Sequence, residues 1–276
     1  MLTATLLALV AAALHASWNL LMKTSDDREL AAWGQFLAGG IIFLPVLVVA
    51  GVPDRAAWPY LVASGLIHVL YVEGLVRAYH HGDFSLAYPL SRGGGALTAA
   101  VGGAILLDDT LRVPSWIALG IVAVGLGSLV QRGATRASLG WAALTAVVIG
   151  SYTLVDTAGA RRTSNGFAYG VALTICAAIA LSAVGMARGR GADLVATLRR
   201  SWWRYLASGL CLTGAYSLVL VAVRFAPVGY VATLRESSVV LGAYAGWALL
   251  GERLALRRLA SALVVTAGLV ALVATR

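Results

Sequence analysis

Apolar residues fill this chain in long blocks that are separated by short polar stretches. The blocks show neither the period-2 stripe of a half-buried strand nor the period-3.6 stripe of a surface helix. Each block is long enough for a helix, rising about 1.5 Å per residue, to cross a hydrocarbon core of about 30 Å. The pattern therefore predicts an all-α integral membrane protein with ten transmembrane helices. The predicted spans are Leu2–Met22, Leu30–Ala50, Ala57–Tyr79, Phe84–Leu107, Val113–Val130, Ser138–Gly159, Gly166–Ala187, Trp203–Phe225, Val228–Leu250 and Leu256–Ala274.

Composition supports a membrane protein and argues against other classes. Of the 276 residues, 60% are hydrophobic and only 12% are charged, too few to cover a soluble domain of this length. The loops are too short to hold a catalytic domain, and no Gly-x-Ser-x-Gly or His-Glu-x-x-His pattern occurs, so we expect no enzyme. Cys176 and Cys211 are expected to pack inside spans, and His80–Asp83 to form a polar loop. We therefore expect no metal site and no cofactor.

The net charge of +9 is explained by the membrane better than by nucleic acid. Positive residues lie mostly at helix ends, and the densest run, Arg199–Arg204, sets Arg beside Trp202 and Trp203. This pattern is typical of an interfacial anchor, which predicts membrane lipids as partners and no nucleic acid. Most Lys and Arg residues fall in the loops that follow odd-numbered spans, and the positive-inside rule then places both termini outside.

An internal repeat divides the chain into two halves. Ala63–Leu66 recurs as Ala207–Leu210 at an offset of 144, and Leu106–Leu111 aligns with Leu249–Leu254 after the loss of one residue. A fainter echo pairs Ser17-Trp18 with Ser151-Tyr152. We therefore predict two five-helix repeats, residues 1–131 and 132–276. Because five is odd, the second repeat enters the membrane inverted, which is the architecture that alternating access uses.

Two segments resemble a known family. Leu14–Lys23 resembles the opening helix of EamA-type members of the drug/metabolite transporter superfamily, and Leu250–Leu254 is similar to the Gly-Glu signature of that family. The first repeat departs from the signature with Asp108-Asp109. The resemblance implies a secondary transporter in the plasma (inner) membrane, often an exporter of amino acids or other metabolites, with the substrate between the halves. It also implies cytoplasmic termini, opposite to the charge distribution, so the orientation stays open.

Ionisable residues within the spans are the candidates for a substrate site, because each costs about 2.5–3.5 kcal/mol at the centre of a membrane helix. The offset of 144 relates Arg92 to Glu236, and we expect this pair to flank a central cavity. Arginine would orient a carboxylate or phosphonate of a small-molecule substrate, and Glu73 and Glu236 are candidates for coupling to protons. The predicted substrate-binding residues are Arg92, Glu236, Arg235, Glu73, His15, Trp18 and Asn19.

Each candidate also has a structural alternative. Glu73 can pair with Arg77 four residues later, Arg235 and Glu236 can pair with each other, and His15 can be a packing residue. Asp156, near the end of its span, is expected at the membrane interface. The functional alternatives are a flippase for an amphiphilic lipid-linked substrate and a membrane scaffold without transport. No feature of the sequence predicts an oligomeric state.

Overall fold

The computed structural model describes residues 1–81, 84–128, 135–250 and 256–275, and in these ranges the regular elements are all helices. The all-helical prediction is therefore confirmed. The Gly-Glu signature at Gly251 and Glu252 and the predicted repeat boundary at 131/132 lie outside the described residues. The elements are α1 (Leu2–Lys23), α2 (Arg28–Ala50), η1 (Arg55–Ala57), α3 (Trp58–His81), α4 (Phe84–Leu106), α5 (Val113–Gly127), α6 (Arg136–Ala160), α7 (Gly166–Ala187), α8 (Gly191–Arg200), α9 (Trp202–Ala222), α10 (Val228–Arg235), α11 (Ser237–Leu250) and α12 (Leu256–Ala274).

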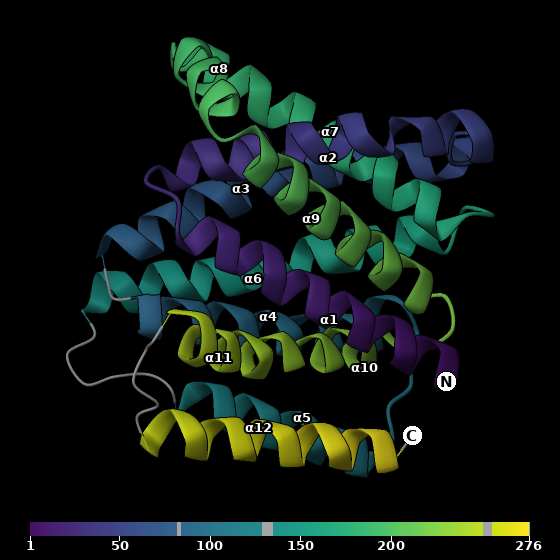
Figure 1. The fold of residues 1–276 in the computed structure, drawn as a ribbon. Helices are drawn as coiled ribbons and strands as arrows, with labels where there is room; N and C mark the ends of the chain where they lie inside the picture. Colours follow the sequence, from purple (N-terminus) through teal and green to yellow (C-terminus); the bar gives the residue numbers. More distant parts are fainter. Residues whose placement is uncertain (82–83, 129–134, 251–255, 276) are drawn as a thin grey trace.

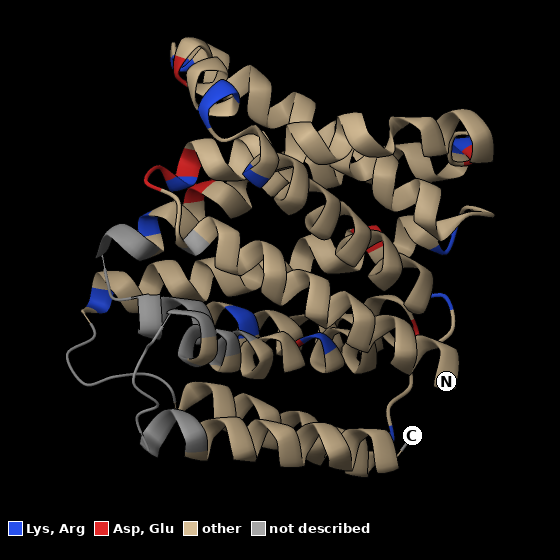
Figure 2. Ribbon diagram, in the orientation of Figure 1, with Lys and Arg blue, Asp and Glu red and all other residues tan. Residues whose placement is uncertain are grey.

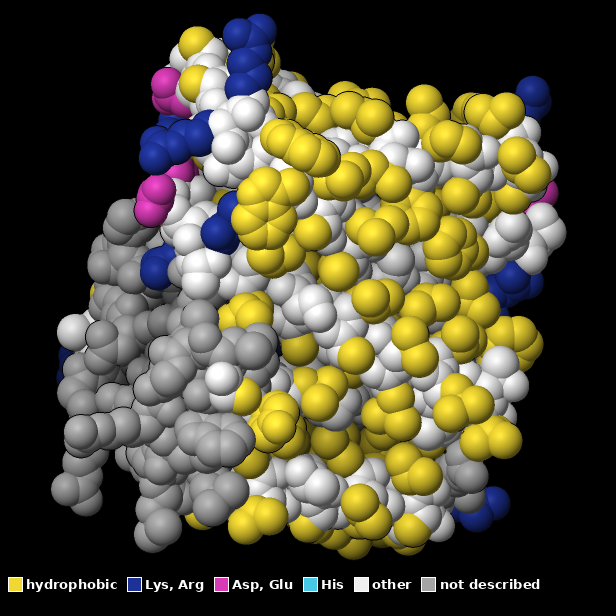
Figure 3. Space-filling model, viewed as in Figure 1, with side chains coloured by type: hydrophobic (Ala, Val, Ile, Leu, Met, Phe, Trp, Pro, Cys, Tyr) yellow, Lys and Arg dark blue, Asp and Glu magenta, His cyan; other side chains and the backbone are white. Residues whose placement is uncertain are grey.

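Six stretches of the described residues are long and apolar enough to cross a membrane, and two further apolar helices are shorter, Val113–Gly127 and Ala260–Ala274. The helices lie along a common direction, with both chain termini at the same end (Figure 1). Charged residues gather at the two ends of the helices (Figure 2), and the face seen in Figure 3 carries a broad hydrophobic band between them. Exposed apolar side chains such as Ile41, Val48 and Val49 fit a lipid surface. The six stretches are Leu2–Met22, Arg28–Ala50, Arg55–Ala78, Arg136–Ala160, Gly166–Ala187 and Trp202–Ala222.

The structure differs from the predicted spans in three places. α3 continues through His81, so His80 and His81 are helical and not part of a loop. A further short helix, α8, lies between α7 and α9, and it is amphipathic, so its apolar face did not form a membrane-length block. The predicted span Val228–Leu250 is divided at Glu236 into α10 and α11.

The division at Glu236 is a local tightening of the helix. The backbone N–H of Glu236 donates to the carbonyl of Thr233, and the N–H of Val239 donates to the carbonyl of Glu236, each at 2.9 Å. Both bonds span three residues where an α-helix spans four, which is the pattern of a 3₁₀ turn. The tightening places Arg235 and Glu236 at a discontinuity in the middle of the predicted span.

Close backbone packing joins α9 to α2. A Cβ atom added to Gly209 would lie 2.6 Å from the backbone nitrogen of Gly39 and 2.9 Å from the carbonyl oxygen of Gln35. Only glycine permits this approach, as in other membrane helix pairs that meet at small residues. The contact holds the first and second halves of the chain together beside the cavity described below.

Asp109 fixes the start of α10. Its Oδ2 accepts a hydrogen bond from the backbone N–H of Val228 at 2.6 Å, and its Oδ1 forms an ion pair with Arg161 at 2.8 Å. Arg161 also donates to the carbonyl of Val223 at 2.9 Å. Asp109 therefore caps the N-terminus of α10, which belongs to the second half of the chain, and links α10 to the end of α6.

Asp108 has a backbone φ of +54°, in the left-handed region that favours glycine. This position aligns with Gly251 of the Gly-Glu signature, so the conformation explains why glycine is expected here. We expect Asp108→Gly to stabilise the protein by about 0.5–1 kcal/mol. Thermal unfolding of the purified protein in detergent measures this. A lower unfolding temperature for Asp108→Gly than for the wild type would contradict the backbone argument.

Candidate functional site

A central cavity of about 60 Å³ lies among α1, α2, α3, α6, α7 and α9, with the end of α10 reaching into its wall. Its polar lining comes from side chains that the helices bury inside the bundle. His15 is 8% exposed, His68 5% and Arg235 5%, so these three groups face the cavity and not the lipid. The cavity is therefore a polar pocket within an apolar molecule.

Aromatic rings form much of the wall. The ring centroids of His68 and Tyr152 are 4.5 Å apart, and those of Tyr152 and Tyr216 are 5.9 Å apart. Phe36 meets His68 edge-on at 5.7 Å, and the Trp18 Nε1–H donates to His15 Nδ1 at 3.2 Å. Such ring pairs are rigid and prefer edge-on or tilted contact. The wall can therefore hold the apolar part of a ligand.

Arg235 is the buried cationic group of the cavity, whose lining also includes the exposed Arg28. Its guanidinium lies 5.5 Å from the centre of the Tyr216 ring, a cation–π contact. Its Nε is buried without a hydrogen-bond partner, and no carboxylate in the described part of the chain forms an ion pair with it. A buried cation that no carboxylate contacts directly is costly, which points to an anionic ligand.

Arg92 and Glu236 meet directly. The Arg92 Nη2 donates to Glu236 Oε1 at 2.8 Å, and the two side chains are only 4% and 3% exposed. The alternative in which Glu236 pairs with its neighbour Arg235 is therefore wrong. The two charges neutralise each other. The ion pair also ties α4 to the break between α10 and α11. Arg235 lines the central cavity, whereas Arg92 and Glu236 do not.

Asp156 lies beneath the cavity, on the side of α6 that packs against α9. The Tyr216 hydroxyl donates to its Oδ2 at 2.6 Å, and the side chain is 0% exposed. The side chain is therefore buried inside the bundle and does not face the surroundings of the protein, as a residue exposed at the membrane interface would. Its span ends only one turn later, but α9 covers this face of α6.

The remaining predicted residues divide into two groups. His15 and Trp18 line the central cavity, whereas the side-chain amide of Asn19 donates to the His15 carbonyl at 2.7 Å and Asn19 is not part of the lining. Glu73 lies apart from Arg92, in ion pairs with Arg77 at 2.8 Å and Arg188 at 3.0 Å. Pairing with Arg77 is the structural alternative for Glu73, and a side chain that is 33% exposed can make it at little cost.

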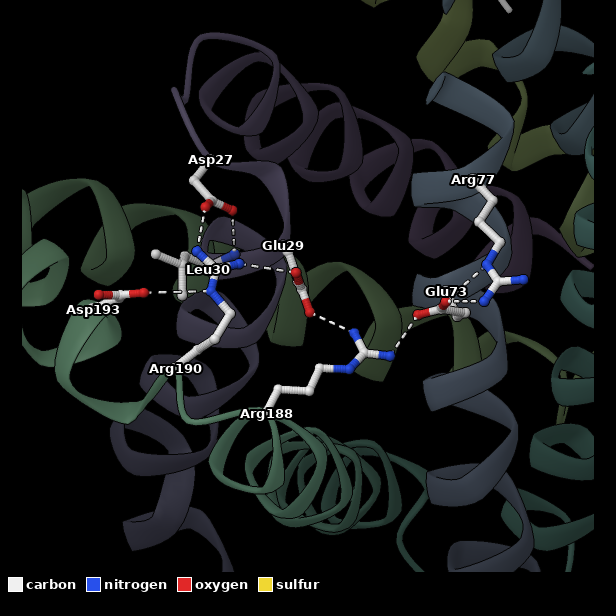
Figure 4. A network of polar contacts seen from close by, with 8 residues as sticks. All are labelled: Asp27, Glu29, Leu30, Glu73, Arg77, Arg188, Arg190 and Asp193. Carbon is white, nitrogen blue, oxygen red and sulfur yellow. Dashed lines mark hydrogen bonds and ion pairs between the residues drawn. The ribbon is translucent and has the colours of Figure 1, made fainter. Parts of the chain in front are cut away.

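Glu73 belongs to a rim network of ion pairs at the ends of α2, α3, α7 and α8 (Figure 4). Arg190 bridges Asp27 at 2.6 Å and Glu29 at 2.9 Å, and Arg188 bridges Glu29 at 2.7 Å and Glu73. These arginines follow α7, so the network links α7 and α8 to α2 and α3. The members of the rim network are Asp27, Glu29, Glu73, Arg77, Arg188, Arg190 and Asp193.

Two outer cavities lie on the same side as the rim network. One, of about 250 Å³, includes Asp27 and Arg204 and shares Met22 and Gln35 with the central cavity. The other, of about 210 Å³, includes Glu29 and Glu73 of the rim network and shares Val72 and Val76 with the central cavity. Both outer cavities therefore border the central cavity through common side chains.

The rim network predicts a pH dependence of stability. Burial acts to raise the pKa of Asp27, but the hydrogen bonds from Arg190 and from the Leu30 backbone outweigh it, and the pKa is lowered. A lowered carboxyl pKa stabilises the fold above its unfolded value, about 3.9, and this contribution is lost as the pH falls through the folded pKa. We expect Asp27→Asn to unfold at a lower temperature than the wild type at neutral pH, with the difference vanishing in strong acid.

Thermal unfolding across the acid range measures this difference. Asp26→Asn is the matched control, since Asp26 is the neighbouring acid, is exposed and is not a member of the rim network. A constant difference between wild type and Asp27→Asn at every pH would contradict the role of the Asp27 charge.

Sequence reasoning missed His68, Tyr152, Tyr216 and Asp156. The repeat contained a signal for Tyr152, because the echo of Ser17-Trp18 in Ser151-Tyr152 pairs two residues that both line the cavity. The offset of 144 likewise relates Val72 to Tyr216, and both line the cavity. Following the repeat from Trp18 would have found Tyr152, whereas Tyr216 corresponds to Val72, which is not among the predicted site residues.

Comparison with known proteins gives the family. The model of the EamA-like transporter family matches residues 136–274. One solved crystal structure superposes on the chain with a TM-score of 0.73 at 16% sequence identity, covering 97% of this chain and 95% of that one. At this identity the likeness shows a shared fold. No curated protein matches the chain.

Proposed function

The chain belongs to the EamA-like transporter family, and from this premise we propose that it is a secondary active transporter that works by alternating access. As a family member it is a multi-pass membrane transporter of small solutes. Its substrate is an amino acid or another small metabolite with a carboxylate or phosphonate group. It exports this substrate across the plasma membrane.

The packing of the helices supports two inverted repeats, residues 1–131 and 132–276. α1 packs on α9 as α6 packs on α3, and α2 packs on α9 as α7 packs on α3. α4 packs on α6 as α10 and α11 pack on α1, while α5 packs on α12. Each contact thus has a counterpart when the five helices of one half exchange with those of the other, as a two-fold axis in the membrane plane requires.

Repeat-related glycines make equivalent contacts. Gly209 of α9 approaches the backbone of α2, and a Cβ on its counterpart Gly65 would lie 3.3 Å from the backbone of Cys176 in α7. A Cβ on Gly125 would lie 2.8 Å from Val265 Cγ2, and one on Gly268 would lie 2.7 Å from Val122 Cγ2. The second pair is reciprocal across α5 and α12, which supports a two-fold axis between these helices.

The observation that carries the substrate class is the Arg235 guanidinium in the central cavity. Arg92 is already paired with Glu236, whereas no carboxylate in the described residues forms a direct ion pair with Arg235, so Arg235 is the buried cation that a ligand can contact. A guanidinium binds carboxylate and phosphonate oxygens bidentately. The aromatic wall beside it accommodates a small apolar body. An anionic solute therefore satisfies the cavity better than a cation does.

The central cavity must widen to admit such a solute. Its volume of about 60 Å³ holds one or two water molecules, each of which takes about 30 Å³ of the liquid. The outer cavities of about 250 Å³ and 210 Å³ share side chains with it, so outward movement of those side chains would join the spaces. Entry from the side of the rim network requires the least rearrangement.

Transport by proteoliposomes tests the proposal. Vesicles that contain the full-length protein would be loaded with radiolabelled amino acids, monocarboxylates, phosphonates, or a cationic amine, and efflux compared with that from protein-free vesicles. We expect efflux of at least one anionic or zwitterionic class and none of the amine. Efflux of the amine alone would overturn the substrate class, and efflux of none would overturn transport of these solutes.

A further inference from the structure

Asp156 is a buried carboxylate that the substrate site does not use. Its Oδ2 accepts the Tyr216 hydroxyl, and its Oδ1 is buried without a hydrogen-bond partner. The side chain is 0% exposed, and no cation in the described residues forms an ion pair with it. An unpaired charge is costly in the interior of a membrane protein, and protonation of the carboxylate removes that cost.

The groups around Asp156 come from every helix that covers it. α9 contributes Tyr216, α7 contributes Tyr169, α3 contributes the Ser64 hydroxyl, and the end of α10 contributes Arg235. Arg235 is the cationic group of this set, and its charge interacts with the Asp156 carboxylate. Both groups also contact Tyr216, one through the hydroxyl and the other over the ring. Tyr216 therefore separates the acid from the cavity and connects it to Arg235.

The other two acids within the predicted spans have their charges compensated. Glu236 pairs with Arg92, and Glu73 pairs with Arg77 and Arg188. An ion pair stabilises the charged form of a carboxylate. These two sequence-based candidates for proton coupling are therefore less suited to gain and lose a proton than Asp156 is.

We propose that Asp156 is the proton-binding residue of this transporter, and that it takes up one proton when an anionic substrate binds to Arg235. This inference rests on the proposed function. The proton adds to Oδ1, which converts the carboxylate into a neutral carboxylic acid, and the Tyr216 hydroxyl remains on Oδ2. No electrons move, and the same bond breaks when the proton leaves.

Competition for one guanidinium supplies the coupling. While Asp156 is charged, its carboxylate attracts Arg235 and repels an anion in the cavity. Protonation removes that attraction and repulsion, so the anion binds more tightly. By linkage the bound anion raises the affinity of Asp156 for the proton by the same factor. One anion and one proton then cross together with no net charge, in whichever direction their combined gradients point.

Infrared difference spectroscopy on the full-length protein in lipid vesicles tests the assignment. Stepping the pH from neutral to mildly acidic should produce the carbonyl band of a protonated carboxylic acid. We expect Asp156→Asn to lose this band and Glu236→Gln and Glu73→Gln to retain it. Tyr216→Phe should shift its frequency, because the hydrogen bond to Oδ2 is gone. Added phenylacetate, a carboxylate with an apolar ring, should enlarge the band at constant pH.

The outcomes separate this inference from transport itself. A band that persists in Asp156→Asn and disappears in Glu236→Gln assigns the proton to Glu236 and overturns the inference. A band that is absent from the wild type at every pH also overturns it. A shifted band in Tyr216→Phe supports the site even if Asp156→Asn fails to fold. If Asp156 titrates but the vesicles move no solute, the transport proposal fails and the proton site stands.

Discussion

Replacing Arg92 by methionine is expected to destabilise the folded protein by about 3–5 kcal/mol, because Glu236 would stay buried without a partner. Glu236 is 3% exposed, so water cannot replace the lost guanidinium. The pair also joins α4 to the break between α10 and α11, so the loss is felt in both halves. Thermal unfolding in detergent measures the effect, and a low yield of folded Arg92→Met is expected for the same reason.

The double variant Arg92→Met with Glu236→Leu provides the control. Replacing a buried ion pair by apolar residues of similar size is often neutral or stabilising, so this variant should recover most of the lost stability. Its recovery would show that the uncompensated charge, and not the altered shape, destabilises the single variant. A single Arg92→Met variant as stable as the wild type would contradict a tight buried pair.

Replacing Arg235 by methionine is expected to leave the fold intact and to weaken anion binding by at least about 30-fold. Removing one partner of a buried charge pair costs about 2–5 kcal/mol, and each 1.4 kcal/mol is a factor of ten. Stability should change little, because no carboxylate of the described chain pairs with Arg235. The concentration dependence of anion efflux from proteoliposomes measures the loss.

Two further variants make the Arg235 result specific. Arg235→Lys keeps the charge but loses the planar fork, so it should bind the anion with intermediate strength. Arg224→Met is the matched control, since Arg224 is exposed at a helix end, where it donates to the carbonyl of Ser164 at 2.6 Å. Normal anion transport by Arg235→Met, or an equal loss in Arg224→Met, would remove Arg235 from the site.

The sequence predicts the helices well because the membrane imposes a simple rule of length and polarity. It predicts the short helices poorly: α8 is amphipathic and the break at Glu236 involves only one residue, so neither interrupts an apolar block. The repeat indicated that Arg92 and Glu236 lie near each other, since an inverted copy brings equivalent positions toward the middle of the membrane, but the two residues form an ion pair and do not line the central cavity. The inverted repeat itself and the substrate role of these residues stay predictions.

The sequence could not separate buried acids from accessible ones. Glu73 and Asp156 both lie in the second half of a predicted span, yet Glu73 is 33% exposed in the rim network and Asp156 is 0% exposed inside the bundle. What differs is the neighbouring helix, and a linear pattern does not identify the neighbour. The aromatic wall was missed for the same reason, because Tyr152 and Tyr216 resemble ordinary apolar residues until α6 and α9 meet.

The partial exposure of the rim network makes its ion pairs easy to break. Its ion pairs are reached by water, and such contacts contribute about 0–1 kcal/mol each. Breaking the ion pairs that join the α7–α8 region to α2 and α3 would therefore require only a few kcal/mol, a cost that a bound solute can offset. Dissolved salt weakens exposed ion pairs and would shift the balance toward separation. We therefore expect the rate of the proposed transport cycle to depend on the ionic strength on that side of the membrane.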